Sequence, residues 1–317
     1  MEARDFPLTA RRALAMALAV VLGGCSLGGG GVTPIRTHFN KGVYFQNKKD
    51  YEPAIHEYRL AVAQNTSDYR ARVNLAMAYE AQAALVAKRD GPAGEIKAMR
   101  ALARTQYEEA LRAQPDELRA SVNLAVMDWE AGQRDVARER LRSLASARPA
   151  EALPLVSLGA LLLREGLNEQ ATATLRGAVS RDPADPDANA MLAEALRRQH
   201  KLGEARAALL RAAKNAPNDT SVLVALGRLA LEADQPEQAA GDLARALYID
   251  PDLLEAHLLR AEALSREGDW VAAAEHLARA DQLSEGRPAA EHQAIEQRLR
   301  TLLEKHLRAD PSGNTAH

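Results

Sequence analysis

Residues 220–253 read TSVLVALGRLALEADQPEQAAGDLARALYIDPDL, and their pattern decides the fold. Small residues, a large apolar residue and a proline follow in the order Ala239, Leu243, Ala246 and Pro251, and this order returns every 34 residues. The prolines that close these segments keep the same spacing: they are Pro115, Pro149, Pro183, Pro217 and Pro251. A fixed period of this length predicts stacked helical hairpins, because each unit buries its apolar face only against its neighbours.

This order of residues resembles the tetratricopeptide repeat, and the resemblance covers residues 35–287. It implies an all-α, right-handed superhelical solenoid of seven helix-turn-helix repeats, followed by a C-terminal capping helix. Repeat one is expected at 35–68, and repeats three to seven are expected at 118–151, 152–185, 186–219, 220–253 and 254–287. Left-handed helix ends are predicted at Gly132, Gly166 and Gly268. Helix starts are predicted at Pro53, Pro154, Pro186 and Pro236.

The second repeat starts at residue 69 and is longer than the others, with extra residues at 84–98. Gly91, Pro92 and Gly94 lie between two helix-forming flanks, which predicts an elongated helical hairpin. Such a hairpin is either a partner-binding prong or a tolerated insertion. After the last repeat, an apolar stripe through Ile295 and Leu299 predicts a capping helix at 288–308 that covers the exposed end of the array. Residues 309–317 are predicted to be disordered.

The first residues of the chain are typical of an export signal. A positively charged start is followed by an apolar run at 13–22, which is too short to span a bilayer. The run ends in Leu22-Gly23-Gly24-Cys25, which resembles a bacterial lipobox. The resemblance implies that 1–24 are a signal peptide, that Cys25 is the acylated N-terminus of the mature protein, and that Ser26 directs it to the outer membrane. The alternative is an ordinary signal peptide that is cut near a cysteine.

Residues 25–34 contain four consecutive glycines, which predict a flexible tether between the anchor and the fold. The formal net charge is −2, so the chain has no overall basic field for nucleic acid. No catalytic motif is present, and we therefore expect no enzyme activity, no cofactor and no small-molecule substrate. Asp182, Asp185 and Asp187 lie close in sequence but lack the glycine and glutamate of an EF-hand loop, so we expect turn and capping roles and no metal.

A candidate binding face lies on the first helix of each repeat, on residues spaced i, i+3, i+4 and i+7. The resemblance assigns this face to the concave groove of the superhelix. Three asparagines share one position on it, similar to a ladder that some tetratricopeptide proteins use to hold a peptide backbone; the alternative is that asparagine is simply common there. The asparagines are Asn40, Asn74 and Asn123. Apolar residues on the same face are expected to be exposed for a partner: Phe39, Val43, Met77, Val126, Trp129 and Leu163. A second, charged part of the groove is predicted from Arg197, Arg198 and Arg228.

These features predict a lipid-anchored adaptor that binds protein segments on the periplasmic side of the outer membrane. The chain resembles, in general terms, tetratricopeptide lipoproteins that act as pilotins for type IV pilus secretins, so assembly of an envelope machine is the first hypothesis. A scaffold for exopolysaccharide export and a docking protein for peptidoglycan enzymes are the alternatives.

Overall fold

The computed structural model describes residues 37–284 and the single positions 293, 294, 297, 301 and 304. Within this part the chain forms fourteen α-helices and no strand. The helices are α2 (His38–Asn47), α3 (Tyr51–Gln64), α4 (Tyr69–Lys88), α5 (Ala93–Ala113), α6 (Leu118–Glu130), α7 (Arg134–Ala147), α8 (Leu153–Arg164), α9 (Asn168–Arg181), α10 (Pro186–Arg197), α11 (Leu202–Asn215), α12 (Thr220–Glu232), α13 (Pro236–Ile249), α14 (Leu254–Glu267) and α15 (Trp270–Ser284). They pair into seven hairpins, as the sequence predicted.

Some of the predicted segments fall outside this part of the chain. The signal peptide, Cys25, the tether and the C-terminal tail all lie outside the described residues. The capping helix predicted at 288–308 also lies outside them, apart from the five single positions, which are helical. Among the described residues, no helix combines the length and the apolar character that crossing a membrane requires.

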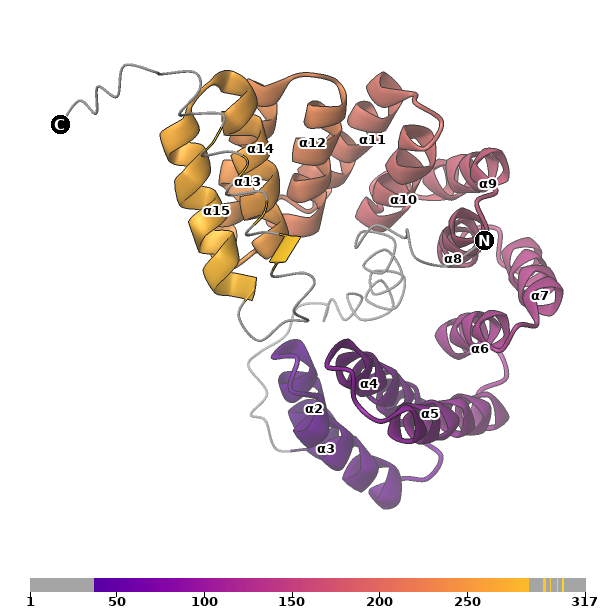
Figure 1. Cartoon of the computed structure of the whole chain (residues 1–317). Helices are drawn as coiled ribbons and strands as arrows, with labels where there is room; N and C mark the ends of the chain where they lie inside the picture. The colour runs from indigo at the N-terminus through magenta and orange to yellow at the C-terminus, as the bar shows by residue number, and fades with distance from the viewer. Residues whose placement is uncertain (1–36, 285–292, 295–296, 298–300, 302–303, 305–317) are drawn as a thin grey trace, which may run out of the picture. The chain divides into compact units, whose positions relative to one another are not determined.

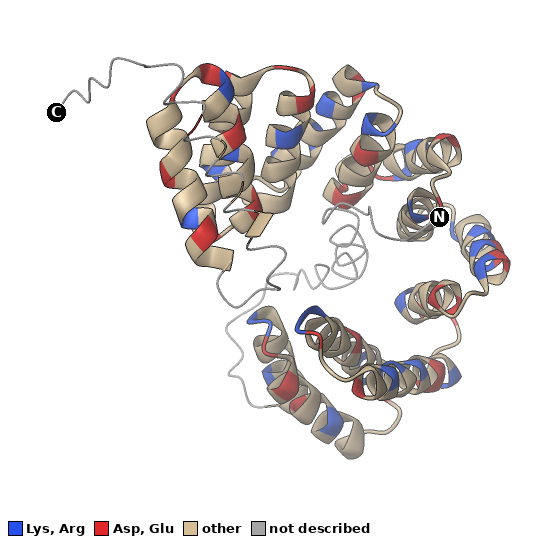
Figure 2. Ribbon diagram, viewed as in Figure 1, with Lys and Arg blue, Asp and Glu red and all other residues tan. Residues whose placement is uncertain are grey.

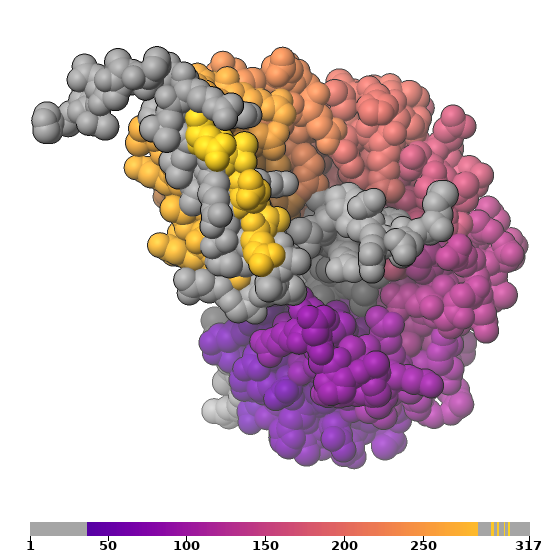
Figure 3. Space-filling model, in the orientation of Figure 1, coloured from indigo at the N-terminus to yellow at the C-terminus, as the bar shows by residue number. Residues whose placement is uncertain are grey.

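The helices belong to two compact units, which divide after Asp182. The first unit holds α2 to α9 and the second holds α10 to α15. Inside each unit, every helix packs against the next one along the chain (Figure 1). First helices of successive hairpins also touch: α2 packs on α4, α6 on α8, and α12 on α14. In the space-filling view the indigo and purple hairpins α2/α3 and α4/α5 form one continuous packed block (Figure 3).

The two helices of each hairpin approach each other where a small residue faces a large one. A Cβ atom added to Gly159 would lie 2.4 Å from Leu175 Cγ, and one added to Gly227 would lie 2.5 Å from Leu243 Cγ. Leu175 and Leu243 are fully buried. Because a side chain cannot approach that closely, glycine at these positions sets the spacing of the two helices, and the leucine fills the space that the missing Cβ leaves.

The turn between the two helices of a repeat needs a left-handed residue. Gly132, Gly166 and Gly268 have φ of 88°, 76° and 88°, which confirms the prediction made for them. The equivalent residues of other repeats adopt the same conformation without being glycine: they are Lys49, His200 and Asp234, with φ of 59°, 57° and 56°. A side chain in this region costs about 1–2 kcal/mol, so the turn geometry is imposed by the packing of the two helices.

The second hairpin is elongated, as the sequence predicted. Its helices α4 and α5 have 20 and 21 residues, against 10 to 15 in the others. The turn uses Asp90 in the left-handed region, and the Gly91 N–H donates to the Val86 carbonyl at 3.0 Å. A Cβ on Gly91 would lie 2.4 Å from Val86 Cγ1, which explains glycine at this tight helix end.

Candidate functional site

The face predicted to bind a partner is largely buried. Met77 and Leu163 are each only 3% exposed, and Val126 is 8% exposed. The expectation that these side chains are exposed is therefore wrong. Met77 belongs to the core cluster of the first unit, against which Phe39 and Val43 pack in part. Because first helices of successive hairpins touch, as α2 touches α4 and α6 touches α8, much of this face is an interface inside the fold.

The three asparagines do not form one accessible row. Asn40 is exposed, whereas Asn74 and Asn123 are 8% and 4% exposed. The Asn123 side-chain amide donates to the Tyr107 hydroxyl oxygen at 2.8 Å, and the Tyr107 hydroxyl donates to Glu80 Oε2 at 2.5 Å. The prediction that Asn123 lies open to a peptide does not fit this burial, and one of its amide donors is used inside the fold.

The chain of hydrogen bonds from Asn123 to Glu80 crosses from one hairpin to the next. Tyr107 takes the place that leucine holds in later repeats, such as Leu141 and Leu175, facing the small residue of its own hairpin. Its hydroxyl needs partners because the side chain is fully buried. Glu80 on the first helix of the same hairpin supplies one, and Asn123 on the first helix of the next hairpin supplies the other.

Two of the asparagines follow hairpins that carry a buried tyrosine. Tyrosine holds this place only in the first two repeats, as Tyr58 and Tyr107, and the following hairpins carry Asn74 and Asn123. The Tyr58 hydroxyl donates to Gln46 Oε1 at 2.8 Å, in the place that corresponds to Glu80. At Asn123 the asparagine therefore serves a buried tyrosine hydroxyl.

Burial sets the protonation of this network. Burial raises the pKa of Glu80 to about 7; the hydrogen bond from Tyr107 opposes the shift, and the charge of Glu130 adds to it. Burial also raises the pKa of Tyr107 well above its ordinary value, with the Glu80 charge adding to the effect. Near neutral pH, Glu80 is therefore close to the midpoint of its titration inside the first unit.

Trp129, at the end of α6, remains partly exposed, as do Phe39 and Val43. Its indole N–H donates to Glu165 Oε1 at 2.6 Å, and Arg138 donates to the other oxygen of the same carboxylate at 2.6 Å. The guanidinium of Arg164 lies 4.1 Å from the indole centroid and that of Arg134 lies 5.5 Å from it. Trp129 is thus held by charged groups and forms part of a polar surface, not of an apolar stripe.

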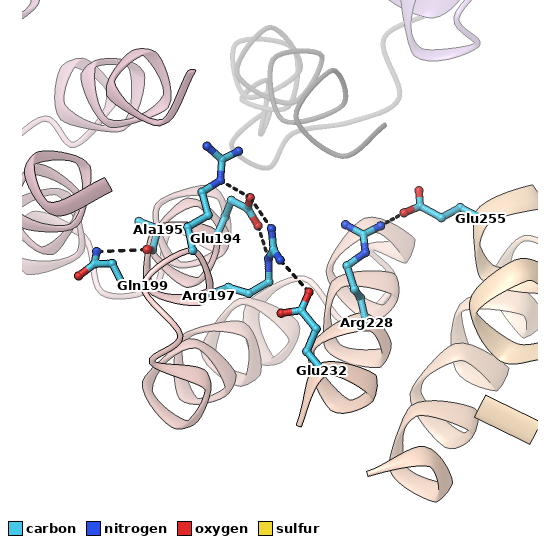
Figure 4. A network of polar contacts seen from close by, with 8 residues as sticks. Glu194, Ala195, Arg197, Gln199, Arg228, Glu232 and Glu255 are labelled. Carbon is cyan, nitrogen blue, oxygen red and sulfur yellow. Dashed lines mark hydrogen bonds and ion pairs between the residues drawn. The ribbon is translucent and has the colours of Figure 1, made fainter. Parts of the chain in front are cut away.

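The charged residues predicted in the second unit are engaged with one another (Figure 4). Arg197 donates to Glu194 at 2.8 Å and to Glu232 at 2.7 Å, and Arg198 donates to Glu194 at 2.7 Å. Arg228 forms an ion pair with Glu255. Arg197 and Arg228 thereby link α10 to α12 and α12 to α14 inside the unit, and the charged part of the groove stays a prediction.

The pKa of the Glu194 carboxylate depends strongly on its arginine neighbours. Burial alone would raise its pKa, but hydrogen bonds and charges from Arg197 and Arg198 outweigh burial and lower it. Glu194 therefore stays ionised well below neutral pH. Each arginine of this group has a carboxylate partner, and the pair of Arg197 with Glu232 joins two first helices of the unit.

Sequence reasoning missed a set of arginines on the second helices. Arg100 and Arg104 of α5 recur as Arg134 and Arg138 of α7, at equivalent places in repeats two and three. This repetition is visible in the sequence, but it lies on the second helices, outside the face that periodicity predicted to bind. Figure 2 shows Lys and Arg positions in blue along both α5 and α7.

Within the described residues, no group of three or more histidine, cysteine, aspartate or glutamate side chains is arranged to hold a metal ion. Asp185 caps α10, accepting from the N–H groups of Asp187 and Ala188 at 2.9 and 3.1 Å. Burial, with the charges of Asp185 and Asp219, raises the pKa of Asp187 to about 7. The capping role that the sequence suggested for Asp185 is therefore confirmed.

Models of the tetratricopeptide repeat match residues 128–186, 162–229 and 224–288, which together cover 128–288, about half of the chain. Among curated protein sequences, none matches significantly.

Solved structures show the same fold at low identity. Human IFIT1, solved as a dimer with PPP-AAAA, is 14% identical with a TM-score of 0.64 over 86% of this chain and 65% of its own. Yeast Tom70 is 13% identical with a TM-score of 0.63 over 96% of this chain and 74% of its own. PilF of Pseudomonas aeruginosa is 20% identical over 62% of this chain and 93% of its own, but its TM-score of 0.46 is too low to support an inference about function.

The hairpin geometry and the family matches agree along the array. Small residues face Leu175 and Leu243 where the helices meet, and left-handed turns recur at the predicted places. Such repeats form protein-binding scaffolds, and the family generally lacks catalytic activity. The chain belongs to the tetratricopeptide repeat family.

Proposed function

We propose that this protein is a lipid-anchored adaptor that holds segments of partner proteins at the periplasmic face of the outer membrane. The observation that carries the binding role is the array of seven helical hairpins, because members of the family use such arrays as scaffolds for protein binding. The anchor is supported by the sequence Leu22-Gly23-Gly24-Cys25 after an apolar run. Two or more acyl chains on Cys25 would give durable attachment, since each buried CH₂ contributes about 0.8 kcal/mol.

The anchor is tested by the change Cys25→Ser. We expect the wild-type protein to fractionate with the outer membrane and the variant to become soluble in the periplasm or to keep its signal peptide. Mass spectrometry of the mature N-terminus reports acylation directly, and a Ser26→Ala variant is the matched control. A processed Cys25→Ser protein that still sediments with the outer membrane would show that attachment uses another route.

We further propose that the partner belongs to an envelope machine under assembly, such as the type IV pilus. Cross-linking in cells, followed by purification through this protein, identifies the partner without relying on an isolated domain. A secretin or another pilus component supports this proposal. Specific enrichment of exopolysaccharide-export proteins or of peptidoglycan enzymes instead would refute it.

A further inference from the structure

Six arginines from three helices surround the last turn of α6 and form a surface that we call the arginine edge. They are Arg100 and Arg104 of α5, Arg134, Arg138 and Arg140 of α7, and Arg164 of α8. Each contacts Asp128, Trp129, Glu130 or Glu165, by ion pairing or by stacking. All of these residues belong to the first unit. The arginine edge is therefore a single local feature, built around the end of α6.

The carboxylates inside the arginine edge are shared between arginines. Asp128, whose side chain is 6% exposed, accepts from Arg104 at 2.9 Å and lies 2.7 Å from Arg140 in an ion pair. Glu130 lies 3.5 Å from Arg100 and 3.9 Å from Arg164, which is within ion-pair range but too long for a good hydrogen bond. Asp128 and Glu130 thus each pair with two guanidinium groups, so positive charge exceeds negative charge around them.

Arg164 shows most directly that the arginines outnumber their acceptors. Its Nη1 atom is buried and has no hydrogen-bond partner among the described residues. Burial lowers the pKa of Arg164 and the charge of Arg100 adds to that effect, while Glu130 opposes it. Arg134 stacks over Trp129 and is exposed. Nη1 is out of reach of a partner, but the Arg164 side chain as a whole is 27% exposed, so an anion beside Arg164 and Arg134 would add negative charge where arginines outnumber carboxylates.

The charge balance of the surface agrees with the local geometry. The six guanidinium groups of the arginine edge meet four carboxylates, those of Asp128, Asp135, Glu130 and Glu165. The chain as a whole carries a net charge of −2, so this surplus is a local property of repeats two to four. The side chains of Arg100 and Arg140 are 47% and 42% exposed and so remain within reach of a partner.

We propose that the arginine edge docks an acidic segment of a partner protein, whose aspartate and glutamate carboxylates pair with Arg100, Arg134 and Arg164. The three arginines lie on three different helices, and Arg100 and Arg164 are already partly neutralised by Glu130. Singly charged carboxylates spaced along a peptide match this distribution better than one compact phosphate group does. The inference rests on the proposed scaffold function and names the chemistry of the partner.

The test measures binding of a fluorescent glutamate-rich peptide to the full chain in detergent, by anisotropy, against the same peptide with glutamine. We expect saturable binding of the glutamate peptide alone, weakened by salt because exposed ion pairs are screened. The double change Arg100→Gln with Arg134→Gln should weaken binding about fivefold to tenfold, since each exposed pair contributes up to about fivefold. The control Arg112→Gln with Arg142→Gln removes two exposed arginines from the same two helices.

The outcomes separate the possible occupants. Failure of the wild-type protein to bind the glutamate peptide, or equal weakening by both double variants, would overturn the proposal. Tighter binding of inorganic phosphate or of a short single-stranded oligonucleotide, with the same dependence on Arg100 and Arg134, would also overturn it in favour of a phosphate ligand. Loss of glutamate-peptide binding in the first variant, with the control unchanged, supports it. The scaffold function itself is tested separately by cross-linking in cells and survives failure of the peptide experiment.

Discussion

Removal of one buried hydroxyl group tests how the first hairpins are held together. Tyr107→Phe deletes the oxygen that donates to Glu80 and accepts from Asn123, at 2.5 and 2.8 Å. Both partners are buried, at 9% and 4% exposure, so water cannot replace the lost contact without opening the interface. A buried polar group left unsatisfied costs about 1–3 kcal/mol. Two such groups predict a loss of roughly 2–6 kcal/mol in the free energy of unfolding.

Tyr58→Phe is the matched control, because Tyr58 holds the same place in the preceding hairpin and is equally buried. Its hydroxyl donates to Gln46, which is partly exposed and can turn to solvent. We expect a smaller loss of stability than for Tyr107→Phe, because a partly exposed partner can bond to water once the hydroxyl is removed. Urea unfolding followed by circular dichroism measures both variants, and hydrogen exchange on α4 to α6 locates the change. Equal losses in the two variants, or a loss under about 1 kcal/mol for Tyr107→Phe, would refute the reasoning.

Two further changes probe packing and titration. Gly227→Ala places a Cβ 2.5 Å from Leu243 and should cost about 1–3 kcal/mol of stability. Gly241→Ala lies on the other helix of the same hairpin, with nothing within 4 Å of the added Cβ, and should gain about 0.5–1 kcal/mol. Melting temperatures that shift in the same direction for both variants would contradict this. The pKa of Glu80 is raised from 4.5 to about 7, so its contribution to stability is complete below about pH 4.5 and is lost as the pH rises through about 7. In the wild-type protein the free energy of unfolding should therefore fall by at most about 3 kcal/mol over that pH range. Glu80→Gln should remove this fall and be more stable than the wild type near pH 8. An unchanged dependence of the unfolding free energy on pH would count against it.

The period of the sequence was enough to predict the helical hairpins. The starts of α6, α10, α12 and α14 fall on or next to the expected first residues of their repeats, since the period is a property of the chain and the caps are local. The turns were predicted only in part. Glycine signals a left-handed residue, but His200 adopts the same conformation because packing imposes it, and no local signal in the sequence shows this.

The binding face was the part that the sequence predicted least well. Periodicity places Met77, Asn123 and Arg197 on one face of their helices, and this placement says nothing of what covers that face. Contacts between successive first helices decide it, and those contacts depend on geometry between repeats. The arginine edge combines residues from first and second helices of different hairpins, so the periodicity of one helix face does not predict it.

The buried polar groups of the first unit have a role that apolar packing alone cannot fill. Alanine, glycine and leucine meet in nearly every hairpin, so an interface built from them would accept several hairpins as neighbours. Asn123 finds a buried hydroxyl only where the preceding hairpin carries tyrosine, and a leucine there would leave its amide without a partner. The Tyr107–Asn123 contact therefore favours the native order of hairpins over a misaligned one. The amide that favours this order is buried, and its bond to Tyr107 lies inside the fold, away from the exposed arginines of the arginine edge.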